Sequence, residues 1–208
     1  MGQAQTALRA LTMSEPPALR TALRVLHTAL NATGRRFMVI GGLAVIARGI
    51  PRQTVDIDAT VEADGITLEE LLSTFRETGI VPRIADAVQF ARERQVLLLQ
   101  HLESKTPIDV SLAWLPYERD ALARATLADL DGEIVPVVAT PDLIVLKAVA
   151  WRDQDLIDVE RLIVRHHRGL DLGWIRSTVS QFYCLLEEPE RIVEFDAAVE
   201  RALHAANR

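Results

Sequence analysis

The sequence predicts an α+β fold, a mixed α/β arrangement in which a small mixed β-sheet with flanking helices precedes an all-helical C-terminal part. Two observations predict it. Short apolar runs and stretches of alternating apolar and polar residues, both typical of β-strands, recur between residues 37 and 138. From residue 140 onward the segments instead place their apolar residues at helical spacing. We therefore expect an N-terminal helical segment over 1–36, a core over 37–139 and a helical C-terminal domain over 140–208.

Glycine and proline residues separate the first elements, because they end helices and interrupt strands. The separating residues are Gly34, Gly41, Gly42, Gly49, Pro51 and Gly79. Between them the apolar spacing predicts helices over 17–33, 43–48 and 67–78, with strands over 37–40 and 55–61.

The later part of the core is expected to contain more strand than helix. Its predicted elements are strands over 87–91, 95–102, 107–113 and 133–138 and one helix over 117–130. The helical domain is predicted to contain helices over 140–151, 154–167, 171–186 and 189–206, with breaks at Gly169 and Pro189.

Composition limits the class of protein. Hydrophobic residues make up 49% of the chain, enough for a sizeable core, yet no apolar run approaches the roughly 18–20 residues that cross a bilayer. Residues 1–17 lack the apolar core of a signal peptide, and the single Cys184 fits a reducing compartment, so we expect a cytoplasmic protein with no membrane partner. The net charge of −6 argues against nucleic-acid binding over a broad face, although arginines in the first half leave room for a local basic pocket.

Two aspartates in the predicted strand 55–61 are the first candidate site residues. Successive side chains of a strand point to opposite faces, so Asp56 and Asp58 project together, with Cα atoms roughly 6.5–7 Å apart. Like charges held side by side repel unless a cation lies between them, and Mg²⁺ suits a pair of carboxylates. The alternative is a solvated sheet face, but aspartate is depleted in strands.

Asp109 is the predicted third carboxylate. It alternates with Ile108 and Val110 in the strand 107–113, as Asp58 alternates with Ile57. If the two strands are neighbours, three carboxylates converge on one patch, which can hold two divalent ions roughly 3.5–4 Å apart for phosphoryl or nucleotidyl transfer. Zinc is not expected, because the histidines show no ligand spacing with Cys184.

A glycine pair precedes these aspartates. Gly41 and Gly42 lie before a predicted helix, where unpaired N–H groups and the helix dipole favour a phosphate. A glycine pair alone more often forms a tight turn. It indicates a phosphate site here only because Asp56 and Asp58 follow it in the sequence.

At these residues the chain resembles the polymerase-β-type nucleotidyltransferase superfamily. The string GGLAVIARGIPRQTVDIDATV has that superfamily's order of glycine pair, helix and Asp-x-Asp. The closest resemblance within it is to the AbiEii-type nucleotidyltransferases, the toxins of type IV toxin–antitoxin systems. Residues 141–163 support this, because such relatives carry a lysine followed by an arginine and a D-x-x-D pair; here these are Lys147, Arg152, Asp155 and Asp158. The resemblance covers about residues 37–165.

The resemblance implies a role for each matching residue. Asp56, Asp58 and Asp109 would bind two Mg²⁺ ions and carry the catalysis together with Lys147. Contacts to the nucleotide would come from Gly41, Gly42, Arg52, Thr54, Lys147 and Arg152. The substrate would be an NTP, the acceptor an RNA such as tRNA or a protein hydroxyl, and the partner a cognate antitoxin.

Rival hypotheses remain open at this point. The enzyme can instead modify a small molecule of the aminoglycoside kind, which suits the acidic balance of the chain, or be an idle nucleotide-binding or interaction module. For the later motif, Lys147 can extend from an apolar helix to solvent, Asp155 can favour a helix dipole, and Asp158 can pair with Arg161 on the surface.

Overall fold

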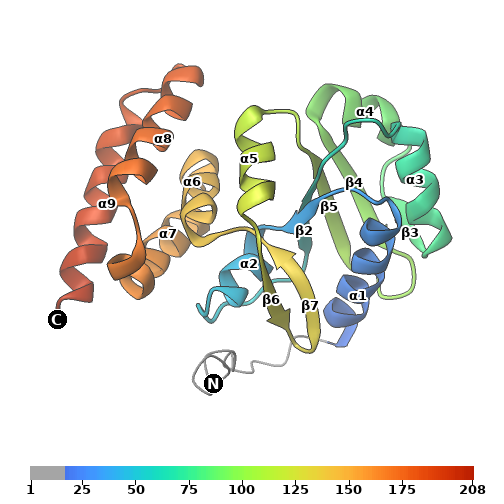
Figure 1. The fold of residues 1–208 in the computed structure, drawn as a ribbon, viewed down its shortest axis with the longest axis horizontal. Coiled ribbons are helices and arrows are strands. Elements are labelled where there is room, and N and C mark those ends of the chain that lie inside the picture. The colour runs from blue at the N-terminus through green and yellow to red at the C-terminus, as the bar shows by residue number, and fades with distance from the viewer. Residues whose placement is uncertain (1–16) are drawn as a thin grey trace, which may run out of the picture. The chain divides into compact units, whose positions relative to one another are not determined.

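The structure of the chain, a computed structural model, describes residues 17–208 (Figure 1). Residues 1–16 lie outside this range. They are the first part of the segment expected over 1–36 and nearly all of the stretch 1–17 in which no signal peptide was expected. The chain forms two compact units that divide between Val138 and Ala139. We call them the sheet unit, up to Val138, and the helical unit, Ala139–Arg208.

The sheet unit is built on one mixed sheet of seven strands in the order β3-β4-β5-β2-β1-β7-β6. The strands are β1 Phe37–Val39, β2 Ile57–Val61, β3 Ile80–Pro82, β4 Val96–His101, β5 Pro107–Leu112, β6 Thr126–Leu130 and β7 Glu133–Val137. The pairs β2–β5 and β1–β7 are parallel and the others antiparallel. This confirms the predicted fold class.

Helices connect the strands and cover the sheet. They are α1 Pro17–Ala32, α2 Gly41–Ala47, α3 Leu68–Glu77, α4 Ala87–Arg94 and α5 Pro116–Arg124. Helix α1 packs on α3 and on strands β2 and β7 (Figure 1). Strands β4 and β5 bury every second side chain, including Leu97, Leu99 and Ile108, and leave the alternate ones half-buried. This alternation sends Asp109 to the more open face of the sheet.

The sequence expectations fail at several elements of the sheet unit. Residues 87–91, expected as a strand, form most of α4, in which the buried Ala87 and Ala91 are four apart, as on one face of a helix. A run of five residues was too short to separate the two periods. The short strand β3 was not expected at all.

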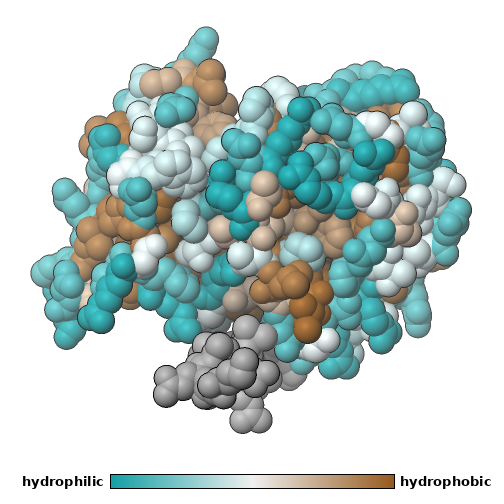
Figure 2. Space-filling view, in the orientation of Figure 1, coloured by the Kyte–Doolittle hydropathy of each residue, from teal (hydrophilic) through white to brown (hydrophobic). Residues whose placement is uncertain are grey.

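The third difference lies at residues 117–130, where one helix was expected. Helix α5 ends at Arg124, and β6 then forms a hairpin with β7 through Asp131 and Gly132, whose φ angles are both positive. Asp-Gly is the typical pair for such a two-residue turn. From the sequence, a strand was expected only after this pair, over 133–138, so the strand before it was missed. Figure 2 shows apolar surface over this hairpin, where Leu127 and Ile134 are exposed.

The helical unit contains α6 Thr140–Ala150, α7 Asp153–His166, η1 His167–Gly169, α8 Leu172–Leu185 and α9 Arg191–Ala206. Helix α6 packs on α7 and α8, and α9 packs on α7 and α8. The buried Tyr183 ties α8 to α6 by donating its hydroxyl to the carbonyl of Ala148 at 2.8 Å. Within residues 17–208, no helix has the length and apolar character that crossing a bilayer requires.

Candidate active site

The centre of the site is a pair of carboxylates on neighbouring strands. Strands β2 and β5 run parallel, and Asp58 lies directly opposite Asp109. Side chains of residues paired across two strands lie on the same face of the sheet. The opposite face at this point is fully buried, with Ile57 and Ile108 adjacent in the same register. The carboxylates were expected to converge only if these two strands are neighbours, and the structure shows that they are.

The glycine pair lies directly against this centre. The backbone N–H of Ile40 donates to the carbonyl of Asp58 at 2.9 Å, which fixes the start of α2 beside β2. Gly41 has φ +62°, and a Cβ atom added to it would overlap the carboxylate of Asp58. A Cβ atom on Gly42 would overlap the hydroxyl of Thr54. Only a chain without side chains at both positions can pass this close to Asp58 and Thr54.

Thr54 and Arg52 complete the segment before β2. Thr54 is buried and donates its hydroxyl to Oδ1 of Asp56 at 2.9 Å. The strand expected over 55–61 begins only at Ile57, so Asp56 lies just before β2 and does not, as was expected, alternate with Asp58 within one strand. The guanidinium carbon of Arg52 lies 3.3 Å from where a Cβ atom of Gly42 would be. The structure thus gathers the expected residues of the sheet unit, namely Gly41, Gly42, Arg52, Thr54, Asp56, Asp58 and Asp109.

One residue that the sequence reasoning missed also belongs to this site. Nη2 of Arg83 lies 2.6 Å from Oδ1 of Asp109. Arg83 follows β3, and its backbone N–H donates to the carbonyl of Leu98 at 3.0 Å. Because β3 was not expected, nothing placed this arginine beside the carboxylates. The available signal was an arginine directly after the apolar pair Ile80-Val81.

The electrostatic setting of Asp109 reflects these neighbours. Partial burial raises the pKa of Asp109 above its ordinary value, and the charge of Asp56 raises it further. The positive charge and hydrogen bond of Arg83 act in the opposite direction, but the pKa stays raised. Asp109 therefore lies within the electrostatic reach of Asp56, and a cation at this point stabilises its charged form.

The donor chemistry of the site fits a hard divalent cation. Magnesium in proteins is held by one or two carboxylates, with substrate phosphates and water completing its coordination. As the side chains stand, however, no three acidic, histidine or cysteine residues among 17–208 gather into a group that could hold a metal ion. Asp109 is paired with Arg83, and Asp56 accepts a hydrogen bond from Thr54. The carboxylates suit a cation, and an arginine now neutralises one of them.

The remaining expected residues belong to the helical unit, where they form one cluster. Nζ of Lys147 lies 2.7 Å from Oδ1 of Asp155 and 2.9 Å from Oδ2 of Asp158. Lys147 and both aspartates are buried. The alternative that Asp158 pairs with Arg161 at the surface is wrong, because Asp158 is fully buried beside Lys147. Lys147 likewise does not extend to solvent.

Asp155 ties the start of α7 to this cluster. Its Oδ2 accepts hydrogen bonds from Nε of Arg152 at 2.7 Å and from the backbone N–H of Arg152 at 3.2 Å. Burial acts to raise the pKa of Asp155, but the hydrogen bonds and charges of Arg152 and Lys147 outweigh it. The pKa therefore lies below its usual range. Asp155 does lie in the first turn of α7, where an acidic residue favours the helix dipole, and it forms these ion pairs as well.

Comparisons with known proteins concern the family and the fold of the chain. A family model described as "Nucleotidyltransferase of unknown function (DUF6036)" matches residues 19–201. No curated protein matches the chain in sequence. Among solved structures, the antibiotic-resistance factor ANT(2'')-Ia in solution has a TM-score of 0.54 at 18% identity, over 80% of this chain and 94% of that one.

Two further solved structures are similar. A crystal structure of ANT(2'')-Ia in complex with adenylyl-2''-tobramycin has a TM-score of 0.52 at 17% identity, over 79% of this chain and 95% of that one. An antigenic nucleotidyltransferase-like protein from Paracoccidioides brasiliensis has a TM-score of 0.48 at 14% identity, over 89% and 94%. At these identities the ANT(2'')-Ia structures establish a likeness of fold.

Proposed function

The chain belongs to the DUF6036 family of nucleotidyltransferases, and from this premise we propose that it moves a nucleoside monophosphate from an NTP to an acceptor hydroxyl at the acidic centre of Asp56, Asp58 and Asp109. One observation carries the proposal. Asp58 lies opposite Asp109 on a neighbouring strand and directly against Gly41, where a side chain would overlap its carboxylate. A phosphate-binding turn and the metal-binding acids of a transferase need this close approach.

The proposed metal ligands are Asp56, Asp58 and Asp109. Two bound Mg²⁺ ions would stabilise the attacking and leaving oxygens of the displacement. In the chain itself, β2 and β5 hold Asp58 and Asp109 in register, and Thr54 orients Asp56 through its hydroxyl. Asp109 is also the residue proposed to receive the proton of the acceptor hydroxyl. Most of the catalytic effect then comes from positioning and charge rather than from covalent chemistry of the protein.

Gly41 and Gly42 are proposed to hold the triphosphate, together with Arg52 and Thr54. The guanidinium of Arg52 lies close to Gly42, and it supplies positive charge beside the turn. The two glycines let the start of α2 lie directly against Asp58 and Thr54, so a phosphate bound by the N–H groups there would lie beside the acidic centre.

Lys147 and Arg152 are proposed to contact phosphate as well, as the family resemblance implies. An ammonium group has three N–H donors, and Asp155 and Asp158 engage the Nζ atom of Lys147. The buried ion pairs support a second role for this lysine, which is to hold α6 against α7.

The acceptor has two candidate classes. The resemblance to AbiEii-type toxins favours an RNA such as tRNA, or a protein hydroxyl, with a cognate antitoxin as the partner of a cytoplasmic toxin. The second candidate is a small polycationic molecule of the aminoglycoside kind. The net charge of −6 and the likeness of fold to ANT(2'')-Ia support this second candidate.

The proposal is tested by following the α-phosphate and the γ-phosphate of the NTP separately. Purified protein is incubated with Mg²⁺ and each of four NTPs labelled at the α- or the γ-phosphate, with total RNA, a protein extract or an aminoglycoside panel. We expect the α-label to enter one acceptor and the γ-label to leave as pyrophosphate. Transfer of the γ-label to an acceptor, or no transfer with any acceptor, contradicts the proposal.

Growth of a heterologous host separates the two acceptor classes. Expression of a toxin arrests growth, whereas expression of a resistance enzyme rescues growth on the drug. The same strains carrying Asp58→Asn show whether either effect depends on the acidic centre.

A further inference from the structure

The cation that the structure places at the acidic centre is the guanidinium of Arg83. Its Nη2 lies 2.6 Å from Oδ1 of Asp109, and the two side chains are 29% and 34% exposed. The pair is therefore neither sealed in the core nor fully solvated. It lies at the carboxylate that the proposed function assigns to a metal ion.

The sheet fixes the position of the Arg83 backbone. The hydrogen bond from the Arg83 backbone to Leu98 continues the pairing of Pro82 with Leu99. Leu98 lies opposite Asp109, and Asp109 lies opposite Asp58. One row thus runs from Arg83, directly after β3, through Leu98 on β4 and Asp109 on β5 to Asp58 on β2. Arg83 starts about 10 Å from Asp109, two strand spacings away, so a long side chain is needed to reach it.

A guanidinium and a divalent cation compete for the same carboxylate. Both are attracted by Asp109, and each repels the other at short range. The Asp109 atom that Nη2 of Arg83 contacts, Oδ1, is one of the two oxygens with which this carboxylate can bind a metal ion. Asp109 has to leave Arg83 before its Oδ1 can join Asp58 around a cation.

We propose that Arg83 is a positioning residue which holds Asp109 in the metal-free enzyme and is released from it when a divalent cation binds. The inference rests on the proposed function, because it uses the same acidic centre. Release moves only the arginine side chain, since β3 and β4 hold the Arg83 backbone in place. Metal affinity is therefore lowered by the strength of one ion pair.

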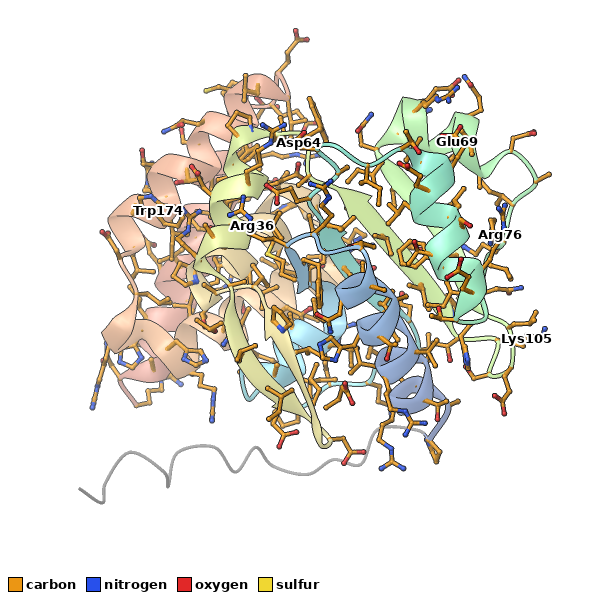
Figure 3. All side chains as sticks on the ribbon, turned by 45° about the vertical axis from the view of Figure 1, so that its right-hand side comes forward. Arg36, Asp64, Glu69, Arg76, Lys105 and Trp174 are labelled. Atoms are coloured by element: carbon orange, nitrogen blue, oxygen red, sulfur yellow. The ribbon has the colours of Figure 1, made fainter. Side chains whose placement is uncertain are left out.

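The chain offers a matched control for this pair. Arg92 on α4 pairs with Glu69 on α3 at 3.1 Å, and the two side chains are 60% and 59% exposed. Glu69 is labelled in Figure 3. Arg83→Gln and Arg92→Gln remove the same charge, but only Arg83 touches Asp109. A general effect of net charge on cation binding is common to both variants. A difference between them reports the Arg83–Asp109 pair.

The first measurement is the affinity for Mn²⁺ alone, from the electron paramagnetic resonance signal of the free ion. A partly exposed ion pair is worth a factor of about two to five. We expect Arg83→Gln to bind Mn²⁺ about two- to fivefold more tightly than Arg92→Gln. Equal or weaker binding by Arg83→Gln overturns the inference.

The second measurement follows the arginine itself. In ¹⁵N-labelled wild-type protein, the Nε–H signal of Arg83 is assigned as the one missing from Arg83→Gln. We expect Mg²⁺ to shift this signal, and a signal that stays in place at saturating Mg²⁺ overturns the release of Arg83. Absence of Mn²⁺ binding in all three proteins overturns the metal site of the proposed function as well. Equal Mn²⁺ affinities in proteins that still transfer the nucleotide overturn only this inference.

Discussion

At the scale of single residues, Gly41 shows how tightly the backbone and the acidic centre are fitted together. Two requirements meet at this position: a φ of +62° and the absence of a Cβ atom beside the carboxylate of Asp58. The first requirement recurs at Gly34, where φ is +66° and nothing lies within 4 Å of an added Cβ atom. An alanine at Gly34 therefore costs only the backbone conformation, whereas an alanine at Gly41 also has to displace Asp58.

Gly34→Ala is expected to destabilise the protein by about 1–2 kcal/mol through its left-handed conformation, and to leave transfer activity unchanged. Gly41→Ala is expected to cost more and to lower transfer activity about 100-fold, because it pushes Asp58 out of position. Urea unfolding and a transfer assay on both variants check this. Full activity of Gly41→Ala contradicts the proposed closeness of the turn and Asp58.

At the scale of elements, the buried ion pairs of Lys147 hold α6 and α7 together. Replacing the lysine leaves Asp155 and Asp158 buried beside an apolar side chain, although Arg152 still pairs with Asp155. Lys147→Met is therefore expected to lower the free energy of unfolding by about 3–5 kcal/mol. Lys105→Met, at an exposed position labelled in Figure 3, is the control and is expected to change it by less than about 0.5 kcal/mol.

Urea titrations of the two lysine variants give the free energies of unfolding. A Lys147→Met protein as stable as Lys105→Met shows that the ion pairs do not hold α6 and α7 together. Loss of nucleotide binding without loss of stability in Lys147→Met instead supports its proposed contact with phosphate.

The same cluster predicts how stability changes in acid. The pKa of Asp155 is lower in the folded chain than in the unfolded chain, where it is about 3.9. Asp155 therefore contributes stability above pH 3.9, which is lost as the pH falls through the folded pKa. Between pH 6 and 3, Asp155→Asn is expected to lose stability less steeply than the wild type. Parallel slopes in urea titrations contradict the lowered pKa.

At the scale of the whole molecule, most of the fold was accessible from the sequence because long helices and alternating strands have clear periods. The helices of the helical unit and strands β4 and β5 lie where the spacing predicts them, whereas β2 begins two residues later than expected and leaves Asp56 outside it. The failures involve short elements. Five residues of α4 fit a strand as well as a helix, and β3 has only three residues.

The candidate site was accessible for a similar reason. Alternation along β2 and β5 places Asp58 and Asp109 on one face, and the parallel pairing then sets them opposite each other. Arg83 was inaccessible because its place depends on the pairing of β3 with β4, which no local pattern reveals. The burial of Asp158 was also missed, because its partner Lys147 lies on another helix.

Asp58 joins the glycine turn to the acidic centre, and the proposed transfer therefore depends on it. The most direct measurement is Mg²⁺-dependent transfer of α-labelled NMP by wild-type protein, Asp58→Asn and Asp64→Asn. Asp64, labelled in Figure 3, is an exposed aspartate that pairs with Arg119. We predict a loss of about 100- to 1,000-fold in Asp58→Asn and none in Asp64→Asn. Wild-type transfer by a folded Asp58→Asn protein would contradict the account.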